Sequence, residues 1–214
     1  MRDLINELTA VHRQVAREAQ DGDEIVRVTM RRRYSTDAPD LWAALTEPER
    51  IARWFMPVSG DLREGGSFQL EGNADGEILR CDPPSQLRTT FGGAESVLTL
   101  TLTPGDDGQT ELRLDHTVPL AMAQNVAGAL FVGPGWDGAF LGLCLYVAGE
   151  AEGDPREVAE SPEVVEFNIA AIDRWSAVAD QAGAAPEEIA QGRAMALAQF
   201  APGTAEAAEA AGNA

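Results

Sequence analysis

The stretch GPGWDGAFLGLCLYV, residues 133–147, decides the fold of this chain. Its large apolar side chains recur at helical spacing, and Asp137 is its only charged residue. The repeating apolar positions are Trp136, Phe140, Leu143 and Val147. A helix that is apolar on nearly every side must be buried by the rest of its domain. The sequence therefore predicts one long core helix, with the other elements folded around it.

The segments that precede this helix carry the two-residue period of β-strands. Residues 96–103 place leucines and threonines at alternate positions, and residues 110–118 alternate in the same way after a turn at 104–108. Residues 25–34 predict an earlier strand, and four shorter strands are expected between residues 61 and 91. Because short turns join consecutive strands, the pattern indicates an antiparallel meander.

Helical spacing also extends to both ends of the chain. Residues 2–20 predict an amphipathic helix, with Leu4, Leu8, Val11 and Val15 on one face. Two further helices are predicted, from Pro162 to about Gln181 and from Pro186 to about Phe200. We therefore expect an N-terminal helix over 1–22, a main domain over 23–150, an acidic linker with C-terminal helices over 151–200, and a disordered tail over 201–214.

Four motifs in the main domain match a known pattern. They are APDLWAALTEP at 38–48, RWFMP at 53–57, LREGGSF at 62–68 and GEILRCDPP at 76–84. Together with Gly135-Trp136, they resemble the SRPBCC (START/Bet v-like) superfamily. Within it, the chain is most similar to the homologues of the activator of the heat-shock-protein ATPase. The resemblance covers residues 25–150.

This resemblance implies an α+β fold of the helix-grip type. In such a fold a curved seven-stranded antiparallel sheet wraps around a long C-terminal helix and leaves a cavity between them. The N- and C-terminal helices would be additions to that domain. The superfamily includes lipid carriers, receptors, cyclases and cochaperone domains, so the fold alone does not assign a function.

The charge of the chain restricts its partners. The formal net charge is -19, and every basic side chain is an arginine. A field of this sign repels phosphate backbones and anionic lipid surfaces, so we expect neither nucleic acid nor membrane as a partner. We find no uncharged apolar run of about 18 residues and no signal peptide. We therefore expect a cytoplasmic protein whose two cysteines, Cys81 and Cys144, are reduced.

The candidate ligand-binding residues are the inward-facing aromatic and polar side chains. They are Trp42, Trp54, Phe68, Phe91, Trp136, Phe140 and Leu143, with His116 and Arg32 as the polar members. The aromatic members either line a cavity or form plain core. His116 either orients a ligand, acts as an acid or base, or is a hydrogen-bonded core histidine. A buried Arg32 needs a carboxylate, which either a ligand or the protein supplies.

The sequence contains no recognisable catalytic set. No cluster has metal-ligand spacing, and neither a nucleophile elbow nor a phosphate loop is present, so we predict no metal or cofactor. The leading hypothesis is a non-catalytic module that binds a small hydrophobic or amphipathic molecule. The alternatives are a cyclase- or hydrolase-type enzyme that uses His116 and Arg32, and a protein-interaction adaptor or chaperone ATPase regulator. The last hypothesis includes a homodimer formed through the terminal helices.

Overall fold

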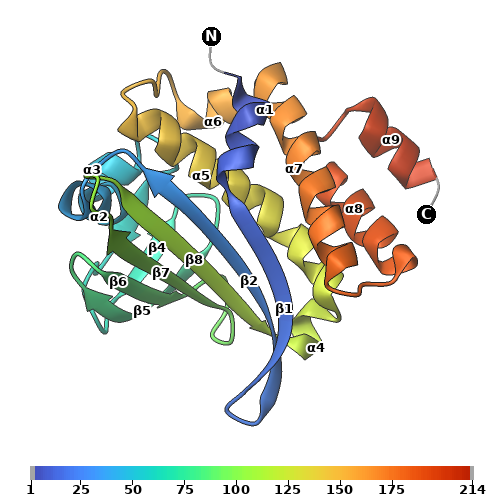
Figure 1. The fold of residues 1–214 in the computed structure, drawn as a ribbon, viewed down its shortest axis with the longest axis horizontal. Coiled ribbons are helices and arrows are strands. Elements are labelled where there is room, and N and C mark those ends of the chain that lie inside the picture. Colours follow the sequence, from blue (N-terminus) through green and yellow to red (C-terminus); the bar gives the residue numbers. More distant parts are fainter. Residues whose placement is uncertain (1–2, 213–214) are drawn as a thin grey trace.

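A curved antiparallel sheet holds helix α5 (Gly133–Val147) against its concave face (Figure 1). The computed structural model describes residues 3–212. Its eight strands run in the order β1-β2-β8-β7-β6-β5-β4-β3. Their bounds are β1 His12–Gln20, β2 Asp23–Tyr34, β3 Val58–Gly60, β4 Ser67–Leu70, β5 Asp75–Asp82, β6 Gln86–Thr90, β7 Val97–Pro104 and β8 Thr110–Pro119. This architecture is the predicted helix-grip fold.

The remaining helices connect the strands or cover the far side of α5. Helices α7 and α8 pack beside α5 on the side away from the sheet, and α2 and α3 close one end (Figure 1). Their bounds are α1 Leu4–Glu7, η1 Leu8–Ala10, α2 Ala38–Thr46, α3 Pro48–Ile51, α4 Leu120–Ala123, η2 Val126–Phe131, α6 Pro155–Ala159, α7 Pro162–Gln181, α8 Pro186–Phe200 and α9 Ala205–Gly212. The two predicted C-terminal helices, α7 and α8, are confirmed.

The alternation read from the sequence sets the register of the central strands. In β7 and β8, Leu98 lies opposite His116 and Leu100 lies opposite Leu114. Since paired residues share one face of a sheet, these side chains point together toward α5. The threonines between the leucines of β7 point to the opposite face.

The predicted N-terminal helix is wrong over most of its length. Only residues 4–10 are helical, and His12–Gln20 forms β1, which pairs with β2 along its whole length. Val11 and Val15 are four residues apart, a spacing that shares one face in a strand as well as in a helix. The informative signal was Asp21-Gly22, whose φ angles of 53° and 96° suit a two-residue hairpin turn.

The structure differs from the expected fold in three further places. Strand β1 raises the strand count from seven to eight, and β3 occupies residues 58–60 where a strand was expected over 61–64. The expected disordered tail contains α9, because its alanines and glutamates are strong helix formers. Residues 213–214 of that tail lie outside the described residues.

The core helix continues a longer apolar run that resembles a membrane span. Residues Val126–Val147 are long and apolar enough to cross a membrane by length and composition, although Asp137 interrupts them with a charge. In the structure the run divides into η2 and α5, and half of it is buried inside the domain. The core helices of soluble proteins pass the same test.

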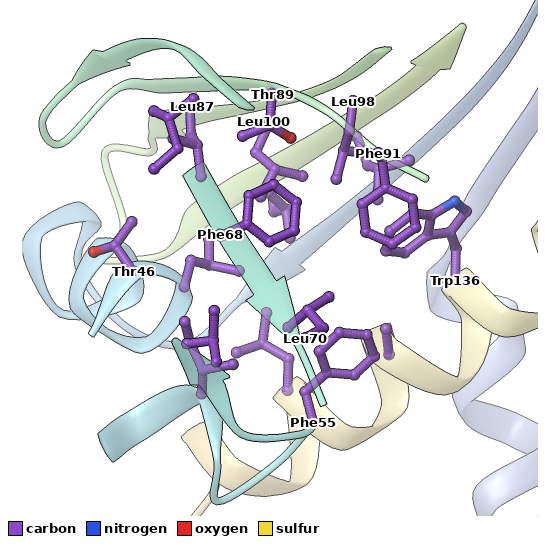
Figure 2. A pocket seen from close by; sticks show the side chains of 18 of the residues that line it. Thr46, Phe55, Phe68, Leu70, Leu87, Thr89, Phe91, Leu98, Leu100 and Trp136 are labelled. Atoms are coloured by element: carbon purple, nitrogen blue, oxygen red, sulfur yellow. The ribbon is translucent and has the colours of Figure 1, made fainter. Parts of the chain in front are cut away.

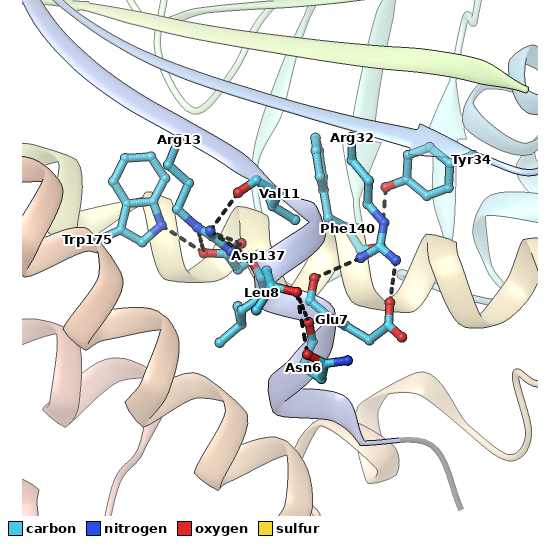
Figure 3. A network of polar contacts seen from close by, with 11 residues as sticks. Asn6, Glu7, Leu8, Val11, Arg13, Arg32, Tyr34, Asp137, Phe140 and Trp175 are labelled. Carbon is cyan, nitrogen blue, oxygen red and sulfur yellow. Dashed lines mark hydrogen bonds and ion pairs between the residues drawn. The ribbon is translucent and has the colours of Figure 1, made fainter. Parts of the chain in front are cut away.

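The single charged residue of α5 joins three distant segments. Asp137 accepts hydrogen bonds from Arg13 of β1, at 2.6 Å from Nη2, and from the indole N–H of Trp175 in α7, at 2.9 Å (Figure 3). The Arg13 and Asp137 side chains are only 5% and 0% exposed. Burial raises the pKa of the Asp137 carboxyl, and the guanidinium and the indole N–H oppose that rise.

A glycine lets α7 approach α5 closely. A Cβ atom at Gly133 would lie 2.4 Å from Cε2 of Trp175, whose ring is fully buried. Gly138 in the same helix has nothing within 4 Å of the equivalent position. Close packing of α7 on α5 therefore requires the glycine at 133 but not the glycine at 138.

We expect Gly133→Ala to lower the free energy of unfolding by about 1–3 kcal/mol, because the Trp175 ring must move. Gly138→Ala should raise it by up to about 1 kcal/mol, since alanine is the better helix residue and meets no neighbour. Chemical denaturation of both variants measures the difference. If both substitutions changed the free energy of unfolding in the same direction, the result would contradict the packing of α7 on α5.

We also expect Asp137→Asn to lower the free energy of unfolding by about 3–5 kcal/mol, because it leaves the Arg13 charge buried without a counter-ion. The double variant Arg13→Met/Asp137→Leu should lose less than the two single variants together. Asp173→Asn is the control: its carboxylate, 59% exposed, pairs with Arg193 on the surface, so its effect should stay within about 1 kcal/mol. If denaturation curves showed that the double variant loses as much free energy of unfolding as the two single variants together, Arg13 and Asp137 would not be coupled.

Candidate ligand-binding cavity

A cavity of about 160 Å³ lies between the concave face of the sheet and α5 (Figure 2). Helices α2 and α3 and the segment after them close one end, and side chains from β4 to β8 form the walls. Two of the wall residues also reach the surface: Leu62 is 36% exposed, and Phe55 is half-buried. The cavity thus occupies the position that the family resemblance implied.

Strand and helix periodicities bring the lining side chains together. In β6 and the residue after it, Leu87, Thr89 and Phe91 occupy alternate positions and point inward (Figure 2). In α5, Trp136, Phe140 and Leu143 follow helical spacing and face them from the opposite side. The wall is therefore built from one face of the sheet and one stripe of the helix.

The wall is almost wholly apolar. Within residues 3–212, no side chain that lines the cavity is charged, and the polar ones are Thr46, Cys81 and Thr89. The Thr46 hydroxyl donates to the backbone oxygen of Trp42 at 2.8 Å. Burial and the neighbouring carboxylates of Glu64 and Asp82 raise the pKa of the Cys81 thiol, which therefore stays neutral. Such a wall favours an uncharged occupant.

The structure separates the predicted site residues into two groups. Six of them line the cavity: Trp54, Phe68, Phe91, Trp136, Phe140 and Leu143. Trp42, His116 and Arg32 lie outside its wall. Contact of any of these nine side chains with a ligand stays a prediction.

His116 lies behind the aromatic end of the cavity. Its ring contacts Phe91 and Trp136, with centroid distances of 5.8 Å to each, and it is 4% exposed. The Trp136 indole N–H donates to Nδ1 at 3.1 Å, so Nδ1 carries no proton. The proton of the neutral ring is then on Nε2, which donates to the Ser96 hydroxyl at 2.8 Å. Burial lowers the pKa of His116 to about 4.

Arg32 has a protein carboxylate as its partner. Its guanidinium forms an ion pair with Glu7 of α1 (Figure 3). It also contacts the sulfur of Cys144 in α5. The Tyr34 hydroxyl, which donates to the backbone oxygen of Phe140, lies nearby, and burial raises the pKa of that phenol. Of the two sources left open by the sequence, the protein therefore supplies the carboxylate.

Sequence reasoning missed some of the wall residues. Thr46, Cys81, Leu87 and Thr89 line the cavity but were not among the predicted inward-facing residues. Leu87 and Thr89 could have been found, because they continue the alternation that ends at Phe91. Thr46 and Cys81 lie at an element's end and beside a bulge in β5, where periodicity gives no direction.

Known proteins share both this sequence pattern and this fold. The model of the family "Activator of Hsp90 ATPase homolog 1-like protein" matches residues 35–144. The crystal structure of CalU16 from Micromonospora echinospora is 34% identical to this chain, with a TM-score of 0.66, and the match covers 79% of this chain and 98% of CalU16. Its solution NMR structure, also 34% identical, gives a TM-score of 0.68 over 81% of this chain and 97% of CalU16.

A more distant similarity concerns DynU16, described as a putative protein in the dynemicin biosynthetic locus. Its crystal structure is 26% identical, with a TM-score of 0.51, and the match covers 60% of this chain and 48% of DynU16. No curated protein matches the sequence. The residues that the family model matches include every residue that lines the cavity. The chain therefore belongs to the family of Activator of Hsp90 ATPase homolog 1-like proteins.

Proposed function

We propose that this protein is a binding module that holds a small, uncharged, mainly apolar molecule between its sheet and α5. The observation that carries the proposal is the cavity of about 160 Å³ with no charged side chain in its described wall. A cavity of about 150 Å³ lined by aliphatic and aromatic side chains is large enough for benzene. An occupant of roughly that size, with up to about ten non-hydrogen atoms, therefore fits without rearrangement.

One further observation supports a small molecule. The similar protein DynU16 is described as belonging to a biosynthetic locus, and such loci are concerned with small molecules. We also propose a cytoplasmic location, where Cys81 and Cys144 would stay reduced.

The geometry of His116 favours binding over acid–base catalysis. Both ring nitrogens are engaged, with Trp136 and Ser96, and the Phe91 and Trp136 rings separate the imidazole from the cavity. Arg32 is held by Glu7 and lies outside the wall as well. A general base must reach the proton that it removes. The enzyme hypothesis required both residues in one cavity, and this arrangement does not provide it.

The packing of the terminal helices does not favour the adaptor hypothesis. It rested on apolar faces of the terminal helices that would cover each other or a partner. In the structure Leu8, Phe167 and Trp175 from those segments are buried at 1%, 1% and 0% exposure. Since the extensions pack on the domain itself, their apolar faces need no second protein.

We expect toluene and naphthalene to raise the melting temperature, and their charged analogues benzoate and benzylammonium to have no effect. A ligand at ten times its Kd stabilises the folded state by about 1.4 kcal/mol, or about 3–6 °C for a chain of this size. Ala139→Leu places three more carbon atoms in the wall and should abolish the shift. Ala159→Leu, on the exposed α6, is the matched control and should keep it. Equal protection by neutral and charged probes would contradict the proposal.

We expect the neutral His116 to make the protein sensitive to acid. In the unfolded chain His116 titrates near 6.5, whereas its pKa in the folded state is about 4. Between these values only the unfolded state binds the proton, so stability present above pH 6.5 is lost as the pH falls toward 4. From pH 7 to pH 5 this loss amounts to about 2 kcal/mol.

Denaturation curves at pH 7 and pH 5 test this value. Between pH 7 and pH 5, the free energy of unfolding should fall by about 2 kcal/mol less in His116→Gln than in the unmodified protein. His12→Gln, at an exposed position of the edge strand β1, is the matched control. Identical pH profiles for His116→Gln and the unmodified protein would show that the imidazole is not held neutral.

A further inference from the structure

The Thr89 side chain differs from the other buried threonines. Thr29, Thr89, Thr90 and Thr110 are the buried threonines within residues 3–212. Thr29 donates to Asp115 at 2.6 Å, Thr110 donates to the backbone oxygen of Thr36 at 2.8 Å, and Thr90 accepts from the backbone N–H of Glu77 at 2.8 Å. Thr89 is 5% exposed, and its side chain makes no hydrogen bond to another described residue. Within residues 3–212 the fully buried side-chain atoms without a partner are Nε of Arg31 and Nε of Arg32, so the Thr89 hydroxyl keeps some accessible surface.

The position of Thr89 explains why the protein offers it no partner. Thr89 lies in β6 between Leu87 and Phe91 on the inward face, and Figure 2 shows it in the wall of the cavity. Its backbone is paired, opposite Ile78 on one side and Leu98 on the other. The side chain points into a space walled by leucines, isoleucine and aromatic rings. The accessible hydroxyl therefore faces the cavity, where it can form a hydrogen bond with a molecule that occupies this space.

The surrounding wall makes water a poor partner. A buried water molecule is held by two to four polar groups. Of the other polar wall residues, Thr46 already donates its hydroxyl to Trp42, and Cys81 offers only a weakly hydrogen-bonding thiol. A ligand that fills the apolar space and carries one polar atom satisfies Thr89 and the aliphatic wall together.

We propose that Thr89 is the residue that orients the ligand, and that the ligand is a neutral apolar molecule with one hydrogen-bonding oxygen, such as an aryl ketone. This inference rests on the proposed function and narrows it. A carboxylate or an ammonium group is excluded from this position, because no charged side chain lines the described wall to balance it. The hydroxyl donates to the ketone oxygen, and the ring occupies the apolar volume beside it.

The test compares two probes of the same shape, acetophenone and α-methylstyrene, which differ in having a C=O or a C=CH₂ group. Thr89→Val removes the hydroxyl but keeps the shape of the side chain and suits a strand. We expect it to weaken the binding of acetophenone about tenfold and to leave that of α-methylstyrene unchanged. Calorimetry or chemical-shift titration gives both dissociation constants.

Two variants control for indirect effects. Thr89→Ser keeps a hydroxyl at the same place and should retain the preference of the unmodified protein. Thr46→Val removes a wall hydroxyl that is already hydrogen-bonded within the protein, so it should change the affinities for the two probes by the same factor.

The outcomes separate this inference from the proposed function. If both probes bind and Thr89→Val changes their affinities equally, Thr89 does not orient the ligand, and the cavity still binds apolar molecules. If toluene binds and acetophenone does not, the inference is also overturned. If toluene, acetophenone and α-methylstyrene all fail to bind the unmodified protein, the proposed function falls together with the inference.

Discussion

Helix α5 is apolar around almost its whole circumference, and this constraint organises the rest of the molecule. The sheet covers one side of the helix, and α7 covers the other at the point where Gly133 leaves room for the Trp175 ring. A curved sheet and a straight helix cannot meet along their full length, so their contact leaves a hollow. The cavity is thus a geometrical result of burying α5.

Polar groups in this interior decide the arrangement of the layers. Asp137 is the one charge on α5, and its pairing with Arg13 and Trp175 fixes the helix against β1 and α7 together. Arg32 does the same for the N-terminal segment through Glu7. Apolar contacts tolerate sliding, whereas a bidentate ion pair in a buried site requires one alignment. The ion pairs therefore set the register, and the apolar residues supply the greater part of the burial.

The sequence allowed the core of the fold to be predicted, because α5 and the strands β7 and β8 have unambiguous periods. It failed at β1, where Val11 and Val15 fit a helix and a strand equally well and pairing with β2 decided the outcome. Six aromatic and aliphatic wall residues were predicted, from the alternation of the strands and the spacing of the helices. The role of the Thr89 hydroxyl could not be predicted. Whether a side chain finds a hydrogen-bond partner depends on distances between strands, and the pattern of apolar and polar residues does not contain these distances.

The ion pair of Asp137 also has a consequence for synthesis on the ribosome. Trp175 follows Asp137 by 38 positions, and Arg13 precedes it by 124. While the nascent chain ends near α5, the carboxylate has one of its two partners, and the helix face that α7 will cover is open to water. Residues 35–144, which match the family model, are thus synthesised before Trp175 is available to cover Asp137. Elongation through α7 is the step that completes this interior.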